Sequence, residues 1–279
     1  MNPWKKVVLE NGEIHLEIFL TRRCNLKCKN CTFYCNINKF ENEVLYPLEQ
    51  VEKDLKHLIS IGVKIKSICI MGGEPTMIKN LTDYFYAIRR SVNPETIITV
   101  FTNTVSLVNL CNSKGIKALK DTGIGIFYTN YMGFVNVKNL LFLKRFGIII
   151  SCIGNIKFKT SHDNLVQNVF NKQTLLPSDF GDSKKEEHFE KCECDILSMC
   201  DGRIYTCGRS LNIKFLNKKF GFNYPEDSYI EVSSLTSADE LIEFSKKSGK
   251  LCSFCANVDP ENAVKVPWSR EPAEVTDYK

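Results

Sequence analysis

Short apolar segments alternate with helical segments through the first half of the chain, and this alternation limits the fold more than any other feature. Runs typical of β-strands lie at 13–20, 65–71, 97–101, 124–128 and 148–153. Helical periodicity separates them, as in the segment that opens at Pro47 and ends at Gly62. Strands spaced by helices pair in parallel through right-handed crossovers. We therefore expect an α/β fold, a partial (β/α)5–6 TIM-like barrel, although a flat parallel sheet gives the same pattern.

Composition excludes several classes of protein. The chain has 279 residues, of which 43% are hydrophobic and 25% charged, as in globular proteins. It contains neither a run of about 18 apolar residues nor a signal-peptide core, so we expect a cytoplasmic protein without a membrane partner. The net charge of +5 is spread in short pairs rather than gathered in one stripe. This distribution disfavours nucleic acid as a partner and is compatible with an anionic small-molecule substrate.

The alternating pattern ends near residue 155, which suggests three parts. We expect a barrel core at 1–155, a linker or substrate-covering segment at 156–191 and a cysteine-rich tail at 192–279. Apart from one helix at 237–247, the tail shows little periodicity. Such a tail would have a thin core of its own, and a metal centre could supply the missing stability.

Ten of the 13 cysteines fall into two clusters, at 24–35 and 192–255. Clustered cysteines in a chain without an export signal more often bind metal than form disulfides. Directly after the first strand, Cys24, Cys28 and Cys31 form a C-x3-C-x2-C pattern. A fully ligated [4Fe-4S] cluster takes four thiolates, so three leave one iron open to another ligand. Structural zinc sites favour paired C-x2–4-C knuckles and fit this triplet poorly.

This triplet resembles the hallmark of the radical S-adenosylmethionine (radical SAM) enzyme family. A second hallmark, the family's GGEP motif, is matched after the second strand by Gly72, Gly73, Glu74 and Pro75. The resemblance implies that this motif holds the methionine ammonium group of SAM, since glycines permit close approach and a carboxylate pairs with a cation. It also implies further SAM contacts toward the adenine, the ribose and the carboxylate, from Asn30, Phe33, Thr102, Asn103, Thr129 and Asn130.

The first cluster departs from the family pattern at one position. The family often places an aromatic residue just before the third cysteine, where this chain has Asn30. Phe33 or Tyr34 would then pack against the adenine. Cys35 follows a complete triplet, so we interpret it as a buried thiol or a hydrogen donor rather than as a ligand.

The second cluster combines separated cysteines. Cys192 and Cys207 form a C-x9-G-x4-C pattern around Asp201-Gly202, a pair typical of hairpin turns, and Cys252 and Cys255 lie far downstream. Together they resemble the Twitch extension of radical SAM enzymes, a shortened relative of the SPASM domain, which implies one auxiliary [4Fe-4S] cluster in a small, irregular C-terminal iron–sulfur extension. Cys194 is the alternative first ligand, Cys200 is spare, and zinc on the same thiolates is the alternative metal.

The resemblance implies two [4Fe-4S] clusters and SAM as cofactors, with a reductant such as flavodoxin or ferredoxin. The first cluster would reduce SAM to a 5′-deoxyadenosyl radical, which removes hydrogen from an unreactive carbon, and the second cluster could accept the substrate's electron. Because the first strand begins near residue 13, we expect no leader-peptide domain ahead of the barrel. The short extension resembles that of aminocyclitol dehydrogenases, so oxidation of a sugar-like or polyol carbinol is the favoured hypothesis.

Two alternatives remain open: a radical SAM epimerase or modifier of a short peptide, and a non-catalytic metal-binding protein. An epimerase needs a thiol that returns hydrogen to the substrate, and the candidates are Cys35, Cys152 and Cys200. A base for dehydrogenation is suggested only by residue type, and Arg209, two residues after Cys207, is the first candidate.

Overall fold

The computed structural model describes residues 11–29, 31–37, 46–129, 135–152, 169–171, 182–192, 196–226, 228–255, 265–267 and 274. Its first half alternates strands and helices, as the sequence predicts. In order these are β1 (Glu13–Phe19), α1 (Leu48–Ser60), β2 (Lys64–Met71), η1 (Pro75–Met77), α2 (Leu81–Arg90), β3 (Ile97–Thr102), η2 (Leu107–Leu110), α3 (Ser113–Thr122), β4 (Gly125–Tyr128), α4 (Val137–Arg145) and β5 (Ile150–Cys152).

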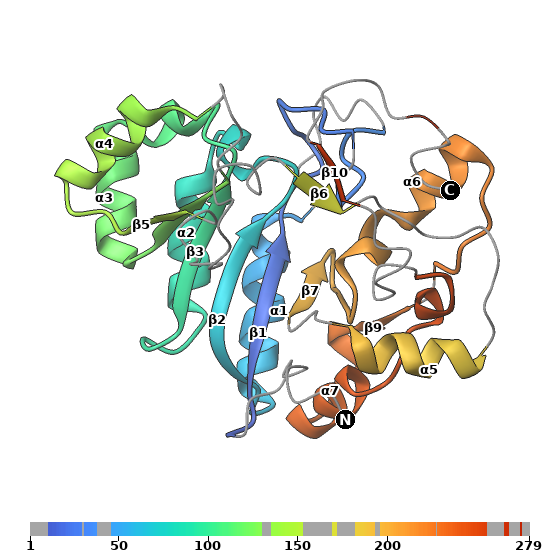
Figure 1. The fold of residues 1–279 in the computed structure, drawn as a ribbon. Helices are drawn as coiled ribbons and strands as arrows, with labels where there is room; N and C mark the ends of the chain where they lie inside the picture. Colours follow the sequence, from blue (N-terminus) through green and yellow to red (C-terminus); the bar gives the residue numbers. More distant parts are fainter. Residues whose placement is uncertain are drawn as a thin grey trace.

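These strands form one parallel sheet in the order β5-β4-β3-β2-β1, with the crossover helices packed along it (Figure 1). Alternation along β1 sets its two faces. Ile14, Leu16 and Ile18 join the main hydrophobic core, which α1, α2 and α3 complete. Glu17 and Phe19 point to the opposite face. The predicted fold class, α/β with a mostly parallel, partial-barrel sheet, is confirmed.

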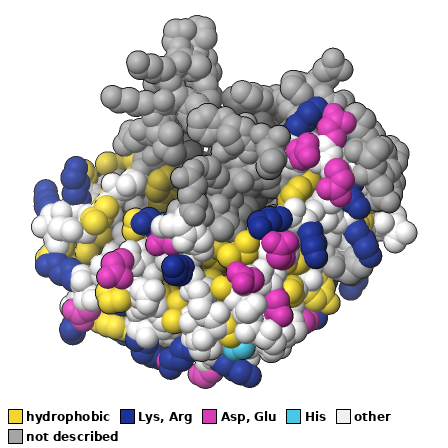
Figure 2. Space-filling view, turned by 90° about the horizontal axis from the view of Figure 1, so that it is seen from below, with side chains coloured by type: hydrophobic (Ala, Val, Ile, Leu, Met, Phe, Trp, Pro, Cys, Tyr) yellow, Lys and Arg dark blue, Asp and Glu magenta, His cyan; other side chains and the backbone are white. Residues whose placement is uncertain are grey.

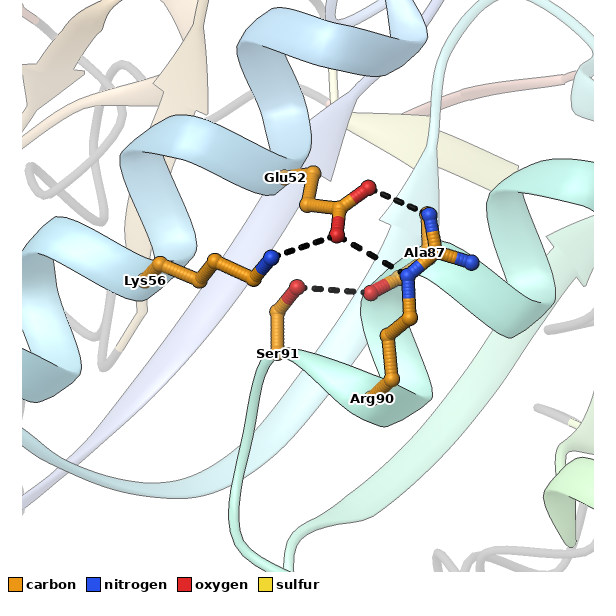
Figure 3. A network of polar contacts seen from close by, with 5 residues as sticks. All are labelled: Glu52, Lys56, Ala87, Arg90 and Ser91. Carbon is orange, nitrogen blue, oxygen red and sulfur yellow. Dashed lines mark hydrogen bonds and ion pairs between the residues drawn. The ribbon is translucent and has the colours of Figure 1, made fainter.

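Neighbouring crossover helices are linked by charge on their outer side. Glu52 of α1 accepts from Arg90 of α2, with 2.9 Å between Arg90 Nε and Glu52 Oε1, and Lys56 approaches the same carboxylate at 2.7 Å (Figure 3). Arg90, followed by Lys56, lowers the pKa of Glu52 to about 2. The contact is exposed, so it orients the helices more than it stabilises them.

The tail continues the core sheet. β7 (Leu197–Cys200) pairs in parallel with β1, so that Leu16 lies opposite Leu197, and the antiparallel β8 (Arg203–Tyr205) and β9 (Tyr229–Glu231) follow. The predicted turn at Asp201-Gly202 joins β7 to β8, and both residues have positive φ, 50° and 75°. The hairpin expected between Cys192 and Cys207 is therefore confirmed.

Several short elements complete the described chain. They are α5 (Asp182–Lys191), η5 (Gly208–Asn212), α6 (Ile213–Phe220), η6 (Val232–Ser234), α7 (Ala238–Ser245) and η7 (Lys250–Phe254), together with a two-stranded sheet of β6 (Val169–Asn171) and β10 (Lys265–Pro267). The helix predicted at 237–247 corresponds to α7. The charged run at 182–187, read from the sequence as linker, is the start of α5. The boundaries of the three parts stay a prediction.

The surface agrees with the dispersed charge of the sequence. On the face shown in Figure 2, basic and acidic side chains are interspersed, and no single-sign stripe is visible among the described residues. No helix in the described part of the chain is both long and apolar enough to span a bilayer.

Candidate active site

The loop after β1 brings the first three cysteines together. Cys24, Cys28 and Cys31 are half-buried and line one cavity of about 160 Å³. Tight turns shape the loop, since Cys31 N donates to Cys28 O at 3.2 Å and Tyr34 N donates to Cys31 O at 3.0 Å. Most of the residues predicted to contact SAM line the same cavity. They are Phe33, Gly72, Gly73, Glu74, Pro75, Thr102, Asn103 and Thr129.

The glycine turn after β2 packs against the backbone that precedes the cysteines. Gly73 N donates to Thr21 O at 2.6 Å, and Glu74 N donates to Arg23 O at 2.8 Å. A Cβ on Gly72 would lie 2.7 Å from Thr21 O, and a Cβ on Gly73 would lie 2.7 Å from the carbonyl of Arg22. Both positions therefore exclude side chains, and the two sequence motifs form one rigid unit.

Glu74 fixes this unit to the next strand. The side chain is 1% exposed, and its carboxylate accepts hydrogen bonds from Thr76 N and Oγ1, from Thr102 Oγ1 at 2.8 Å and from Asn103 N at 2.7 Å. Burial raises the pKa of Glu74, and these four donors oppose that shift. The carboxyl thus joins the ends of β2 and β3 at the cavity wall, in addition to the SAM contact expected from the sequence.

Asn103 connects β3 to the first cysteine. Its Nδ2 lies 3.7 Å from Cys24 Sγ and donates to Asn25 Oδ1 at 2.8 Å. Thr129 N, after β4, donates to Thr102 O at 3.1 Å. Thr102, Asn103 and Thr129 therefore meet at one edge of the sheet, where ligands of parallel α/β proteins bind.

Sulfur atoms in the cysteine loop accept hydrogen bonds, as metal-binding thiolates commonly do. Leu26 N donates to Cys24 Sγ at 3.4 Å. The Cys35 thiol and backbone N–H groups of Cys35, Phe33 and Asn36 donate to Cys31, which lowers the pKa of Cys31. The same pairing and burial raise the pKa of Cys35. Three thiols that line one cavity, two of which accept N–H···S hydrogen bonds, fit a [4Fe-4S] cluster that has one open iron.

The other residues predicted to contact SAM, and the alternative aromatic residue, lie in different places. Phe33 lines the cavity and packs on Phe19 with 5.1 Å between ring centroids, and Pro75 opens η1. Tyr34, the other aromatic candidate, is fully buried in a separate cluster with Ile37 and Leu251. Asn30 and Asn130 lie outside the described residues.

The second set of cysteines assembles from distant segments. Cys192 follows α5, Cys207 follows β8, and Cys252 and Cys255 lie in and directly after η7. Cys252 interacts electrostatically with the other three thiols. Burial raises the pKa of Cys207 to about 11 and that of Cys252 to about 12, and charge on the neighbouring sulfurs adds to both shifts. Cys194 lies outside the described residues.

Other segments hold this second set in place. His188 of α5 donates from Nδ1 to Cys252 O at 2.9 Å, which ties α5 to η7. Arg209 is 8% exposed and donates from Nη1 to Cys255 Sγ at 3.6 Å. The structure thus places Arg209, the candidate base, directly against the second set.

Two of the candidate hydrogen donors lie beside the first set of cysteines. Cys35 and Cys200 are buried in one cluster with Phe19, Tyr205 and Leu211, and Cys24, Cys31 and Phe33 pack against it. The side chain of Cys152 lies outside the described residues.

Glu17 is the residue that sequence reasoning missed. Its carboxyl is 6% exposed and accepts a hydrogen bond from Ser198 Oγ of β7. Burial raises the pKa of Glu17 to about 7, and the bond from Ser198 limits the shift. The only sequence signal was a carboxylate on the β1 face opposite Leu16 and Ile18.

Comparisons with known proteins agree with this site. Residues 18–139 match the family described as the Radical SAM superfamily. The match begins within β1 and ends within α4, so it contains the cysteine triplet, the glycine turn and the ends of β3 and β4. This part of the chain is a radical SAM domain.

Curated relatives cover less of the chain. A GTP 3′,8-cyclase of Helicobacter pylori is 36% identical over 110 residues, which is 39% of this chain and 32% of that protein. A GTP 3′,8-cyclase of Clostridium perfringens is 26% identical over 163 residues, 58% of this chain and 49% of that protein. The chain thus spans about a third to a half of the length of the curated relatives it matches.

Solved structures that align with this chain include BtrN in complex with AdoMet and 2-DOIA. It aligns with a TM-score of 0.48 and 17% identity, covering 95% of this chain and 97% of that chain. Native anSMEcpe with bound AdoMet aligns with a TM-score of 0.37 and 16% identity, covering 50% of this chain and 42% of that chain.

Proposed function

We propose that this protein is a radical SAM enzyme that oxidises a carbinol carbon of a sugar-like or polyol small molecule. In this proposal Cys24, Cys28 and Cys31 hold the SAM-binding [4Fe-4S] cluster. Cys192, Cys207, Cys252 and Cys255 hold an auxiliary [4Fe-4S] cluster. The protein works in the cytoplasm, and flavodoxin or ferredoxin supplies the initiating electron.

One observation carries the proposal: the loop of the second cysteine set reaches the cavity of the first. Gly208 directly follows Cys207, and a Cβ on Gly208 would lie 2.8 Å from Cε1 of Phe33, which lines the SAM cavity. The same Cβ would lie 2.9 Å from Glu17 Oε1. A substrate beside Phe33 would therefore lie near both cysteine sets, as oxidation by a second centre requires.

The arrangement of the thiols supports clusters over zinc. No three or more His, Cys, Asp and Glu side chains in the described ranges are placed to hold a single metal ion. Tetrahedral zinc with Zn–S bonds of about 2.3 Å needs sulfurs roughly 3.8 Å apart. A cubane spreads four thiolates over four irons and so spaces them more widely.

The chain's own residues supply positioning and proton transfer. When bound, the SAM-binding cluster and SAM supply a radical that removes hydrogen from carbon. Gly72 and Gly73 leave room at the wall, Asn103 orients Cys24, and Phe33 borders the substrate. The carbinol becomes a carbonyl in three losses. The carbon loses its hydrogen atom to the radical, the hydroxyl loses its proton to Glu17 or water, and the substrate radical loses one electron to the auxiliary centre.

The test begins with SAM cleavage. Anaerobically reconstituted protein with dithionite should form 5′-deoxyadenosine and methionine, and Cys28→Ala should abolish both. Cys111→Ala, a cysteine outside the SAM cavity, is the matched control. A substrate panel then follows, with myo-inositol, an aminocyclitol, GTP and short peptides. The dehydrogenase proposal expects a product two mass units lighter from a cyclitol, and turnover of GTP alone would overturn it.

Epimerisation is the second candidate, because Cys35 and Cys200 lie in one cluster with Phe33 and could return hydrogen to a substrate. Running the reaction in deuterated water separates the two. An epimerase leaves one deuterium on carbon at unchanged oxidation state, whereas a dehydrogenase leaves none.

A further inference from the structure

Arg209 is a buried cation that interacts with the Tyr34 phenol and with the sulfurs of the second set. It lies in η5, and Nη1 donates to Cys255 Sγ at 3.6 Å. Its guanidinium also interacts electrostatically with Cys207 and Cys192. One side chain thus faces three of the four thiols in the second set.

No carboxylate among the described residues lies within ion-pair distance of Arg209. Two more exposed arginines do pair with carboxylates: Arg203 pairs with Glu231 at 2.8 Å, and Arg90 pairs with Glu52. A buried, unpaired cation is costly by several kcal/mol, so burial of Arg209 requires negative charge nearby. Neutral thiols carry none, whereas metal-bound thiolates do. The surroundings of Arg209 therefore match cysteines that are deprotonated and ligated.

We infer that Arg209 is the counter-charge of the second cluster and raises its reduction potential. The inference rests on the proposed auxiliary cluster. Four thiolates outweigh the positive charge of the iron–sulfide core, and reduction adds one more negative charge. A fixed cation at hydrogen-bond distance from one ligand stabilises the reduced state more than the oxidised state. The electron leaving the substrate radical is then accepted more readily.

Arg209 is a positioning residue in this scheme, because it acts through Cys255 and does not touch the substrate. A merely structural role would depend on the shape of the side chain. The electrostatic role depends on its charge. Arg209→Lys keeps the charge, whereas Arg209→Met keeps much of the length and loses the charge.

The experiment measures the potential directly. In a full-length background with Cys24, Cys28 and Cys31 replaced by alanine, the second cluster is the only source of a [4Fe-4S]⁺ signal in electron paramagnetic resonance. Redox titration of this signal should show that Arg209→Met makes one-electron reduction at least tenfold less favourable, a shift of about 59 mV to lower potential. Arg209→Lys should recover most of the shift, and Arg90→Met, an exposed arginine on α2, should show none.

Several outcomes decide the question. Equal potentials for the parent and Arg209→Met, or for Arg209→Met and Arg209→Lys, would overturn the inference. A folded Arg209→Met protein that fails to bind iron, beside an Arg209→Lys protein that binds it, would support the same need for positive charge. No cubane signal in the parent would overturn the auxiliary cluster itself, and the counter-charge role with it.

Discussion

Single atoms decide how the two motifs of the SAM site fit together. Gly73 has no room for a Cβ, because the carbonyl oxygens of Arg22 and Arg23 occupy that space. A sequence pattern identifies such a glycine by its position beside Glu74. It cannot show that the tight contact is with the cysteine loop, since that contact depends on the distance between two loops.

Gly73→Ala tests this contact. The added methyl should push the turn away from the cysteine loop, destabilise the protein by about 1–3 kcal/mol and weaken SAM binding at least tenfold. Equilibrium dialysis with SAM and thermal unfolding measure the two effects. Gly125→Ala in β4 is the control, because its Cβ would meet only ordinary contacts at 3.5 Å and beyond. Equal SAM affinity in the two variants would contradict the prediction.

Glu17 gives the stability a pH dependence with a defined sign. Its folded-state pKa of about 7 lies above the ordinary value of 4.5, so the folded protein holds the proton more tightly. Protonated Glu17 makes its full contribution to the free energy of unfolding below about pH 4.5. This contribution, roughly 3 kcal/mol, is lost as the pH rises to about 7.

Glu17→Gln cannot ionise and should remove this loss. Urea unfolding at pH 5, 6, 7 and 8 would show a declining midpoint for the parent and a flatter one for the variant. Glu52→Gln is the control, because the lowered pKa of Glu52 places its titration below this range. If the urea midpoint of the parent did not decrease as the pH rises from 5 to 7, the raised pKa of Glu17 would be refuted.

At the scale of elements, the sequence predicts long amphipathic segments well and short strands poorly. α1, Leu48–Ser60, lies within the helical segment predicted between Pro47 and Gly62, because its apolar residues recur with helical spacing over 13 residues. β8 and β9 have three residues each, too few to show a period. They are strands because β7 pairs with β1 and offers an edge. The hydrogen bond from Ser198 to Glu17 could not be predicted either, because it depends on the same pairing of β7 with β1, which are far apart in the sequence.

In the proposed function, the tail carries the oxidation step and the parallel sheet carries the cleavage of SAM. η7 contributes Cys252 to the second set and no lining residue to the SAM cavity. Cys252→Ala should therefore keep SAM cleavage in the presence of substrate while product formation is abolished. Liquid chromatography with mass spectrometry measures 5′-deoxyadenosine and product together. Circular dichroism must confirm that the variant folds, because loss of a metal centre can unfold a small region. Full product yield from folded Cys252→Ala would show that the second cluster is not essential.

At the scale of the whole molecule, the two proposed clusters predict the metal content. Reconstituted protein should hold about eight irons with matching sulfide, four per cubane. Replacing Cys24, Cys28 and Cys31 together by alanine should leave about half of the iron and no SAM cleavage. Elemental analysis and sulfide assays give the numbers. About four irons with stoichiometric zinc in the parent would refute the second cluster.

The pairing of β1 with β7 also governs how the chain is made. β2, the partner on one side of β1, follows it closely, whereas Leu197, which pairs with Leu16, is synthesised about 180 residues later. At ribosomal rates of about 5–20 residues per second, that edge stays open for roughly 10–40 s. During this time β1 presents bare backbone donors and acceptors, which are prone to pair with other chains. A nascent chain halted before residue 197 should therefore be an aggregation-prone species that depends on chaperones, even though its first cysteine loop is complete.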